Sequence, residues 1–231
     1  RTLFADVSLQ LGSGRRVALV GSNGTGKTTL IDAFVAGLAD DGAVWIGYGQ
    51  CIEQYVAGEA YLPLLEALGR LGRATVEIGF IHVLTQHAPS WVVHMPALTS
   101  PETWEGLRQR GSGATRERML RELAEALETL TTQKPVVLVL EDLHWSDAST
   151  LEWLNYVARR RDPARLLVLG TYRPLEVVAS DHPLRSVSHE LLRHQHSVAL
   201  ALPLRRLDRN KVRVSIVPIS WCGLTMLSNI C

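Results

Sequence analysis

The sequence has little cysteine and little lysine, and it has no long apolar run. The few cysteines and the short apolar runs each argue against a class of protein. Its three cysteines are scattered through 231 residues without a CxxC pair, which argues against a disulfide framework and a cysteine-based metal site. No apolar stretch approaches the roughly 20 residues that cross a bilayer, so we expect no membrane insertion. The first residues lack the charged start and apolar core of a secretory signal, so we expect a cytoplasmic protein.

An excess of charge of either sign is also missing. The sequence balances 24 Lys and Arg against 23 Asp and Glu, for a formal net charge of +1. A chain that coats nucleic acid or an anionic membrane carries a clear excess of positive charge. We therefore expect no direct nucleic-acid binding from this chain alone. Only three of the basic residues are lysines, which makes Lys27 conspicuous in a chain that otherwise uses arginine.

What is present is the alternation of strands and helices that is typical of an α/β protein. Short apolar runs predict buried parallel strands over residues 17–20, 43–48, 136–140, 166–170 and 198–202, and a looser alternation predicts a strand over 3–11. Amphipathic periodicity predicts helices over 27–38, 58–72, 115–130, 148–161 and 182–193, with short helices within 73–114. This order predicts a mostly parallel sheet that is covered by helices on both faces.

The loop that follows the strand over 17–20 matches the phosphate-binding pattern GxxxxGK(S/T). Its backbone N–H groups would form an anion nest, and the helix that starts near Lys27 would direct the positive end of its dipole at the phosphates. Lys27 would reach the β- and γ-phosphates, and the Thr28 hydroxyl would bind Mg²⁺. A structural glycine turn, the alternative, has no use for Lys27. We therefore expect ATP and Mg²⁺ as cofactors, with a nucleotide-binding set of Gly21, Ser22, Asn23, Gly24, Thr25, Gly26, Lys27, Thr28 and Thr29.

Two acids follow the most strand-like run, residues 136–140, in the Walker B arrangement. In P-loop ATPases one such acid holds Mg²⁺, and the next can orient the attacking water as a general base. We assign Glu141, together with Thr28, to the metal and Asp142 to catalysis, while the reverse assignment of the two acids stays open. The alternative is a pair of solvated turn carboxylates.

Four residues directly after these acids are further candidates. Ser146 or Asp147 is placed to cap the helix that is predicted from near Ala148. His144 and Trp145 form either a packed loop or a switch that senses the Mg²⁺–phosphate site, and the packed loop is the interpretation we favour.

The strand over 166–170 leads into a Gly-Thr-Tyr-Arg-Pro sequence at residues 170–174. Some P-loop ATPases have an extra strand between the P-loop strand and the Walker B strand, and the end of that strand carries a sensor of the γ-phosphate. Thr171 or Arg173 would face this phosphate. We favour Arg173, because the forked donors of a guanidinium suit phosphate oxygens. The alternative for Arg173 is a surface arginine that is ion-paired to a neighbour.

From about residue 30 to residue 207 the chain resembles the AAA-type ATPase domain of bacterial signal-transduction regulators of the STAND class. This class is close to the AAA domains of replication initiators, and it includes LuxR-type ATP-binding regulators and cyclase-linked ATPases. The likeness is carried by the segments 49–55 (GQCIEQY), 58–63 (GEAYLP), 140–147 (LEDLHWSD), 170–174 (GTYRP) and 182–185 (HPLR).

This resemblance implies a P-loop NTPase three-layer sandwich of the ASCE type. It implies a regulatory ATPase that hydrolyses ATP slowly and acts as a nucleotide-dependent switch in signalling or transcription regulation. The implied ligands are ATP and ADP, and the implied partners are further copies of the chain or effector domains outside this segment.

Two stretches depart from this family. Residues 3–30 look more like the start of an ABC-transporter ATPase, although no LSGGQ-like signature precedes the Walker B strand, which ends in Glu-Asp rather than Asp-Glu. Residues 208–231 do not continue the helical pattern and are typical of a truncated or out-of-frame tail. We therefore predict an ATPase domain over residues 1–207 and an atypical tail over 208–231.

Two alternative functions stay open at this point. One is an ABC-type ATPase subunit that powers transport. The other is a nucleic-acid-associated AAA ATPase of the replication-initiator type, which would use the arginines clustered at 159–161 and 205–209. We interpret these arginines as solvated helix ends.

Overall fold

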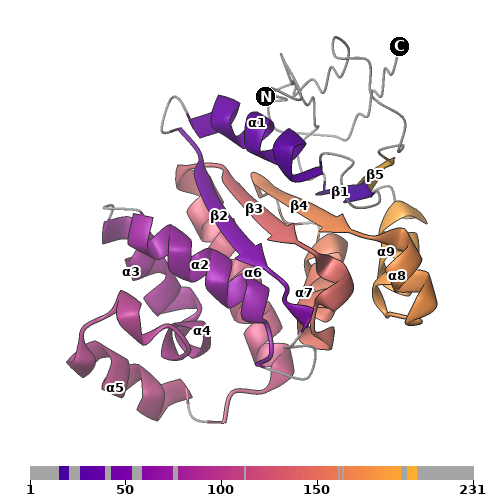
Figure 1. The fold of residues 1–231 in the computed structure, drawn as a ribbon. Coiled ribbons are helices and arrows are strands. Elements are labelled where there is room, and N and C mark those ends of the chain that lie inside the picture. Colours follow the sequence, from indigo (N-terminus) through magenta and orange to yellow (C-terminus); the bar gives the residue numbers. More distant parts are fainter. Residues whose placement is uncertain are drawn as a thin grey trace.

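The structure is a computed structural model, shown in Figure 1, and not every segment of the chain is described. The described residues are 16–20, 27–39, 43–53, 59–74, 78–111, 113–160, 162, 164–193 and 197–201. The predicted strand over 3–11 and the predicted tail over 208–231 lie outside these residues. None of the described helices is both long enough and apolar enough to cross a membrane.

Five parallel strands form the central sheet. They are β1 (Arg16–Val20), β2 (Trp45–Gln50), β3 (Val136–Glu141), β4 (Leu166–Tyr172) and β5 (Ser197–Ala201), arranged in the order β2-β3-β4-β1-β5. Every neighbouring pair in this order is parallel. Strand β4 therefore lies between β1 and β3, which is the insertion that the ASCE arrangement requires. The predicted α/β fold, a three-layer P-loop NTPase sandwich, is confirmed.

Helices cover both faces of this sheet (Figure 1). Helix α1 (Lys27–Ala39) lies on one face, while α2 (Leu62–Ala74), α6 (Arg116–Gln133) and α7 (Ala148–Arg159) lie on the other. Leu138 and Leu140 of β3 belong to the main apolar cluster, which also contains residues of α2, α6 and α7. Val137 and Val139, which alternate with them, are buried outside that cluster. Burial on both faces explains why β3 reads as an unbroken apolar run.

Helix α2 rests directly on the backbone of β2. A Cβ atom at Gly49 would lie 1.8 Å from the carbonyl oxygen of Pro63, and one at Gly47 would lie 2.9 Å from the carbonyl oxygen of Ala67. Both glycines occupy the same face of the strand, because side chains alternate along it. The close approach of helix and strand therefore depends on the absence of side chains at these two positions.

A helical block joins β2 to β3 after α2. It consists of α3 (Ile78–His87), α4 (Pro89–Val93), the 3₁₀ turn η2 (Pro96–Leu98), α5 (Pro101–Gly111) and α6. The short helices that the sequence predicts within residues 73–114 are therefore present. The core of the block holds fully buried apolar side chains, among them Phe80, Trp91 and Leu123.

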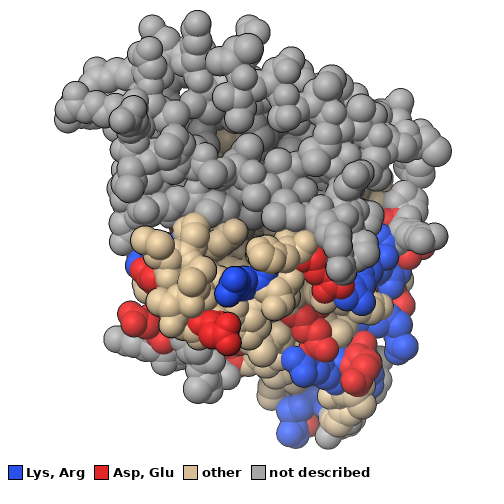
Figure 2. All heavy atoms as spheres, turned by 90° about the vertical axis from the view of Figure 1, so that its right-hand side faces the viewer, with Lys and Arg blue, Asp and Glu red and all other residues tan. Residues whose placement is uncertain are grey.

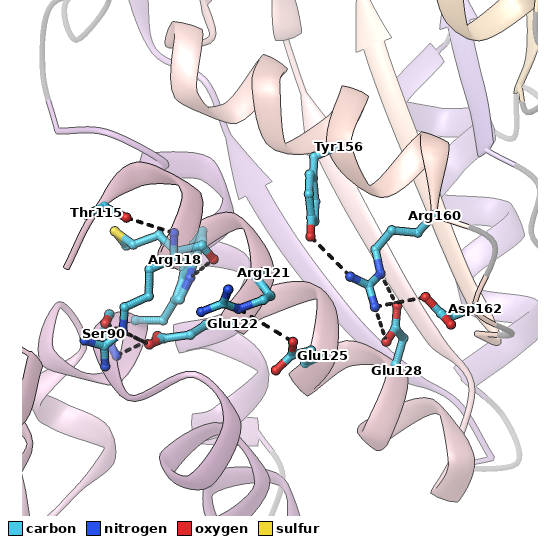
Figure 3. Close-up of polar contacts among 12 residues, drawn as sticks. Ser90, Thr115, Arg118, Arg121, Glu122, Glu125, Glu128, Tyr156, Arg160 and Asp162 are labelled. Carbon is cyan, nitrogen blue, oxygen red and sulfur yellow. Dashed lines mark hydrogen bonds and ion pairs between the residues drawn. The ribbon is translucent and has the colours of Figure 1, made fainter.

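One buried acid ties the helical block together. The Glu122 carboxylate accepts hydrogen bonds from the Ser90 N–H at 2.9 Å, the Ser90 hydroxyl at 3.1 Å and the Arg118 guanidinium at 2.6 Å (Figure 3). A second ion pair in Figure 3, between Arg160 and Glu128 at 2.9 Å, joins the end of α7 to α6. These three donors compensate the charge of the buried carboxylate, which would be costly to leave without partners.

The largest difference from the predicted elements lies after β4. The sequence predicts one helix over 182–193, whereas the structure has two helices, α8 (Pro174–Ala179) and α9 (Leu184–Arg193). Proline suits the first turn of α8 because its fixed φ matches a helix start. Six residues are too few to show helical periodicity, so no sequence pattern predicted this helix. A smaller shift affects β2, predicted over 43–48, whereas α2 is the helix that the sequence predicts within 58–72.

Candidate nucleotide site

The carboxyl ends of β1, β3 and β4 meet at one edge of the sheet. Val20, the last residue of β1, is level with Tyr172 of β4, and Leu140 of β3 is level with Gly170 of the same strand. Residues that follow these strands are therefore neighbours in space, although more than 100 positions separate the end of β1 from the ends of β3 and β4 in the sequence. In parallel α/β sheets this edge is where ligands bind.

The predicted phosphate loop connects β1 to α1 at this edge. Helix α1 begins at Lys27, as the sequence predicts. Gly21, Ser22, Asn23, Gly24, Thr25 and Gly26 lie outside the described residues, and for Lys27, Thr28 and Thr29 the structure gives the backbone alone. The first turn of any helix has N–H groups without helical acceptors, which suits an anion. The assignment of these nine residues to nucleotide binding stays a prediction.

Glu141 is the last residue of β3, and electrostatics link it to α1. Its carbonyl oxygen accepts the Cys51 N–H at 2.9 Å, which fixes the strand end against the residue after β2. Burial raises the pKa of Tyr48 on β2, and the carboxylates of Asp32 on α1 and of Glu141 raise it further. Because side chains alternate along a strand, Glu141 shares its face with Val137 and Val139, which is the face that α1 covers.

Asp142 has a backbone conformation that is uncommon for a residue other than glycine. Its φ of 57° and ψ of 44° lie in the left-handed region, which costs most residues about 1–2 kcal/mol and is tolerated best by asparagine and aspartate. The turn at Asp142 ends the strand abruptly and starts the 3₁₀ turn η3 (Leu143–Trp145). Its side chain is 24% exposed, so the carboxylate is accessible from one side.

Thr171 on β4 holds the backbone of Asp142 in place. Its hydroxyl oxygen accepts the Asp142 N–H at 3.0 Å, and the residue is only 2% exposed. Gly170, one residue earlier, makes room for η3, because a Cβ there would lie 2.5 Å from the Leu143 side chain. The sequence offered Thr171 as a possible γ-phosphate contact, and the structure shows its oxygen bonded to the neighbouring strand end.

His144 is buried behind the two acids. Its Nε2 lies 3.1 Å from a carboxylate oxygen of Glu176 on α8, and its Nδ1 lies 4.0 Å from a carboxylate oxygen of Asp142. Burial lowers the pKa of His144 below its ordinary value, although both carboxylates oppose this effect. Its ring packs on Trp145, with the two centroids 4.5 Å apart. The contact with Trp145 supports the packed loop that we favoured from the sequence. The two carboxylate contacts place this loop beside Asp142 and Glu176.

Arg173 lies directly after β4, at the N-cap of α8. Its guanidinium donates a hydrogen bond of 2.6 Å to Glu176, and its central carbon lies 4.9 Å from the centre of the Trp145 ring. The hydrogen bond lowers the pKa of Glu176. Arg173 is thus ion-paired to a neighbour, as one of its two predicted alternatives states. Sequence reasoning missed Glu176, although its spacing of three from Arg173 is typical of helical ion pairs.

Asp147 is the cap that the sequence offered as one of two choices. Its carboxylate accepts the Thr150 N–H at 2.9 Å at the start of α7. It also accepts the Tyr61 N–H at 3.1 Å, and this bond joins the start of α2 to the loop after β3. Ser146 instead donates its hydroxyl to the Leu143 carbonyl at 2.8 Å within the η3 turn. Both residues therefore stabilise the loop rather than face a ligand.

The acids at this edge fit a nucleotide-bound Mg²⁺ better than a protein-only metal site. Among the residues that the structure describes, no group of three or more His, Cys, Asp or Glu side chains is placed to hold a metal ion. Mg²⁺ in nucleotide sites takes only one or two protein ligands, and phosphates and waters supply the others. Glu141 and Asp142 are oxygen donors of the required kind.

The charge on the face that carries α8 and α9 is mixed. Figure 2 shows this face, where basic and acidic side chains lie side by side. In the arginine cluster at 159–161, Arg159 pairs with Glu190, and Arg160 pairs with Glu128 and with Asp162. These two arginines are thus engaged with carboxylates of the chain itself.

Two solved structures match about four fifths of this chain at a low level of similarity. It matches the structure of Drosophila ORC bound to DNA over 82% of this chain and 81% of that chain, with 12% identity and a TM-score of 0.39. It matches a Walker-type ATPase of Pyrococcus abyssi over 80% of this chain and 48% of that one, with 15% identity and a TM-score of 0.38. Scores of this size carry no argument about function.

Curated relatives match over short stretches only. An antibiotic resistance protein of Mycobacteroides abscessus is 57% identical over 49 residues, which is 20% of this chain and 9% of the relative. The ribosome protection protein VmlR of Bacillus subtilis is 39% identical over 65 residues, which is 28% of this chain and 12% of the relative. The chain thus spans about a tenth of the length of these relatives.

A family model gives the broader match. The model of the AAA ATPase domain matches residues 2–169, well over half of the chain. That range includes the predicted phosphate loop, strand β3 and both acids after it. Together with the observed P-loop NTPase fold, this match shows that the chain belongs to the AAA ATPase domain family of nucleotide-binding proteins.

Proposed function

We propose that this chain binds ATP with Mg²⁺, hydrolyses it slowly and acts as a nucleotide-dependent switch in signalling or transcription regulation. One observation carries the proposal: β4 lies between β1 and β3, and Thr171 at its end bonds to the backbone of Asp142. This arrangement gathers the start of α1, the two acids and Arg173 at the same edge of the sheet. The likeness to STAND-class regulators supports the regulatory role.

In this proposal the first turn of α1 and the loop before it bind the phosphates. Lys27 contacts the β- and γ-phosphates, while Thr28 and Glu141 hold Mg²⁺, which would offset the charge of the phosphates when bound. Asp142 orients the attacking water as a general base. Its partial exposure and its fixed backbone support this role, because a base needs both access to water and a set position.

Arg173 is the proposed sensor of the γ-phosphate. Its guanidinium supplies forked donors at the end of β4, one strand away from the end of β1. Self-association or effector domains outside this segment would pass on the nucleotide state, and a cytoplasmic location is part of the same proposal. The ABC-type and replication-initiator functions are predictions from the sequence alone.

Replacement of Lys27 tests the site. In a calorimetric titration with Mg·ATP, Lys27→Ala should lose detectable binding while its circular dichroism spectrum stays unchanged. The matched control is Lys134→Ala, since Lys134 ends α6 just before β3, at the opposite edge of the sheet. The control should bind with the affinity of the unmodified chain. Unchanged binding by Lys27→Ala would overturn the phosphate-loop assignment.

A further inference from the structure

Glu176 on α8 contacts two different residues of the site with its two carboxylate oxygens. One oxygen accepts the hydrogen bond from Arg173 at 2.6 Å. The other lies 3.1 Å from Nε2 of His144, whose side chain is fully buried. The Glu176 carboxylate, which is 44% exposed, thus has a cation on one side and a buried ring on the other.

These contacts form a continuous path from the proposed base to the proposed sensor. Asp142 lies 4.0 Å from His144, His144 lies against Glu176, and Glu176 binds Arg173. Within this path Glu176 contacts Arg173 directly, whereas Asp142 is linked to it through His144 and Glu176. Trp145 adds a second contact to that arginine, because the guanidinium stacks over its ring at 4.9 Å.

We propose that Glu176 is a positioning residue that competes with the γ-phosphate for Arg173 and thereby sets how strongly the chain distinguishes ATP from ADP. This inference rests on the proposed function. A guanidinium that donates to the Glu176 carboxylate must give up that bond before it donates the same N–H group to phosphate. The γ-phosphate of ATP and the Glu176 carboxylate are two anions that attract the same guanidinium, so ATP binding weakens the Arg173–Glu176 pair, whereas ADP has no γ-phosphate and leaves the pair intact.

The neighbours of Glu176 allow the pair to form again after the γ-phosphate is gone. His144 is held by the packing of its ring on Trp145, so its contact with Glu176 does not depend on Arg173. Glu176 is also fixed in α8, three residues after Arg173. Glu176 thus keeps its neighbour His144 when the guanidinium leaves, and Arg173 can return to the same carboxylate.

The test compares ATP and ADP binding by the unmodified chain and by Glu176→Gln, which keeps the size of the side chain and removes its charge. Calorimetric titrations with Mg·ATP and Mg·ADP should show ATP binding strengthened about two- to fivefold, the range that partly exposed ion pairs supply, with ADP binding unchanged. Glu190→Gln is the matched control. This variant removes the carboxylate of another Arg–Glu pair, in which Arg159 on α7 contacts Glu190 on α9. It should change neither the ATP affinity nor the ADP affinity.

The double variant Arg173→Ala/Glu176→Gln separates competition from a general effect of charge. If Glu176 acts only through Arg173, the double variant should bind both nucleotides as Arg173→Ala does. A gain in ATP affinity that persists in the double variant would overturn the inference, as would equal changes for ATP and ADP in Glu176→Gln.

Failure of this inference and failure of the proposed function give different results. If Arg173→Ala narrows the ATP/ADP affinity ratio but Glu176→Gln leaves it unchanged, the competition is wrong and the sensor role stands. If the unmodified chain binds no ATP, the proposed function is overturned and the inference with it.

Discussion

The buried titratable side chains of the helical block between β2 and β3 and those of the carboxyl edge of β3 and β4 differ in how completely they are hydrogen-bonded. In the block, the Glu122 carboxylate accepts two hydrogen bonds from Ser90 and one from Arg118. At the edge, neither nitrogen of His144 nor Nε of Arg173 has a well-aligned hydrogen bond among the described residues. The edge also holds Asp142 in a left-handed conformation.

This difference separates the regions that stabilise the fold from the region that is proposed to bind the nucleotide. Incompletely bonded groups and sparsely populated backbone conformations cost free energy, and they persist in proteins mainly at functional sites. The block and the α2–β2 contact raise the free energy of unfolding, whereas the groups at the edge lower it. Substitutions in the two regions should therefore change the free energy of unfolding in opposite directions.

The largest effect is expected where α2 rests on β2. Gly49→Ala places a Cβ atom 1.8 Å from the Pro63 carbonyl oxygen, so the backbone of the helix or of the strand has to move. We expect the free energy of unfolding to fall by about 3 kcal/mol or more, since overpacking of two backbones cannot be relieved by a rotamer change. Urea denaturation followed by circular dichroism measures this fall.

Gly106→Ala is the matched control for this substitution. Gly106 lies inside α5, and an added Cβ there meets no atom within 4 Å. Alanine in a helix interior is favoured over glycine by about 0.5–1 kcal/mol, so this variant should be slightly more stable. Equal loss of stability in both variants would mean that the α2–β2 contact is not what makes Gly49 necessary.

The second effect is expected at the buried acid of the block. Glu122→Ala leaves the Ser90 N–H and hydroxyl without their acceptor and leaves Arg118 without its partner. We expect a loss of about 2–3 kcal/mol in the free energy of unfolding. Glu125→Ala is the control on the same helix, because its pair with Arg121 is exposed and should contribute less than about 1 kcal/mol. A similar loss in both variants would contradict the role given to burial.

The sequence predicted those parts of the molecule that depend on local pattern. The run at 136–140 predicted β3, because a strand buried on both faces is apolar throughout. The two acids after it, the start of α1 at Lys27 and the cap of α7 were also found from residue types at fixed spacings. These features depend on neighbours along the chain, which a single sequence displays directly.

What the sequence could not predict depends on contacts through space. Nothing in the sequence places Thr171 against Asp142 or Glu176 against His144, because these contacts depend on the order of strands and on the path of α8. Helix α8 itself is too short to show periodicity, and Arg173 at its N-cap provides no side-chain cap. The partners of the candidate residues therefore came from the structure alone.

A third, smaller effect is expected from pH. Burial lowers the pKa of His144 and of His182 in the folded chain below the ordinary value of 6.5. Well above pH 6.5 both histidines are neutral in the folded and the unfolded chain, so they contribute no change in stability with pH. Below it the unfolded chain takes up protons that the folded chain does not, so the free energy of unfolding falls. Urea denaturation at pH 7.5 and 5.5 measures this fall.

Replacement of these histidines tests the source of the pH effect. His144→Gln and His182→Gln should each flatten the dependence of stability on pH between 7.5 and 5.5. The dependence should not reverse sign in either variant. If both variants retain the full slope, the buried histidines are not its cause.

The smallest effect on stability is expected at Asp142, and it should have the opposite sign. Glycine adopts the left-handed conformation without the steric cost that a Cβ brings, so Asp142→Gly should raise the free energy of unfolding by about 0.5–1 kcal/mol. The same variant lacks the proposed base, so ATP hydrolysis, measured as phosphate release, should fall while Mg·ATP still binds.

Asp142→Asn is the control, because asparagine also tolerates this conformation: it should lose hydrolysis without the gain in stability. A loss of stability in Asp142→Gly would show that the edge holds no strain at this residue, and normal hydrolysis in Asp142→Asn would show that Asp142 is not the base.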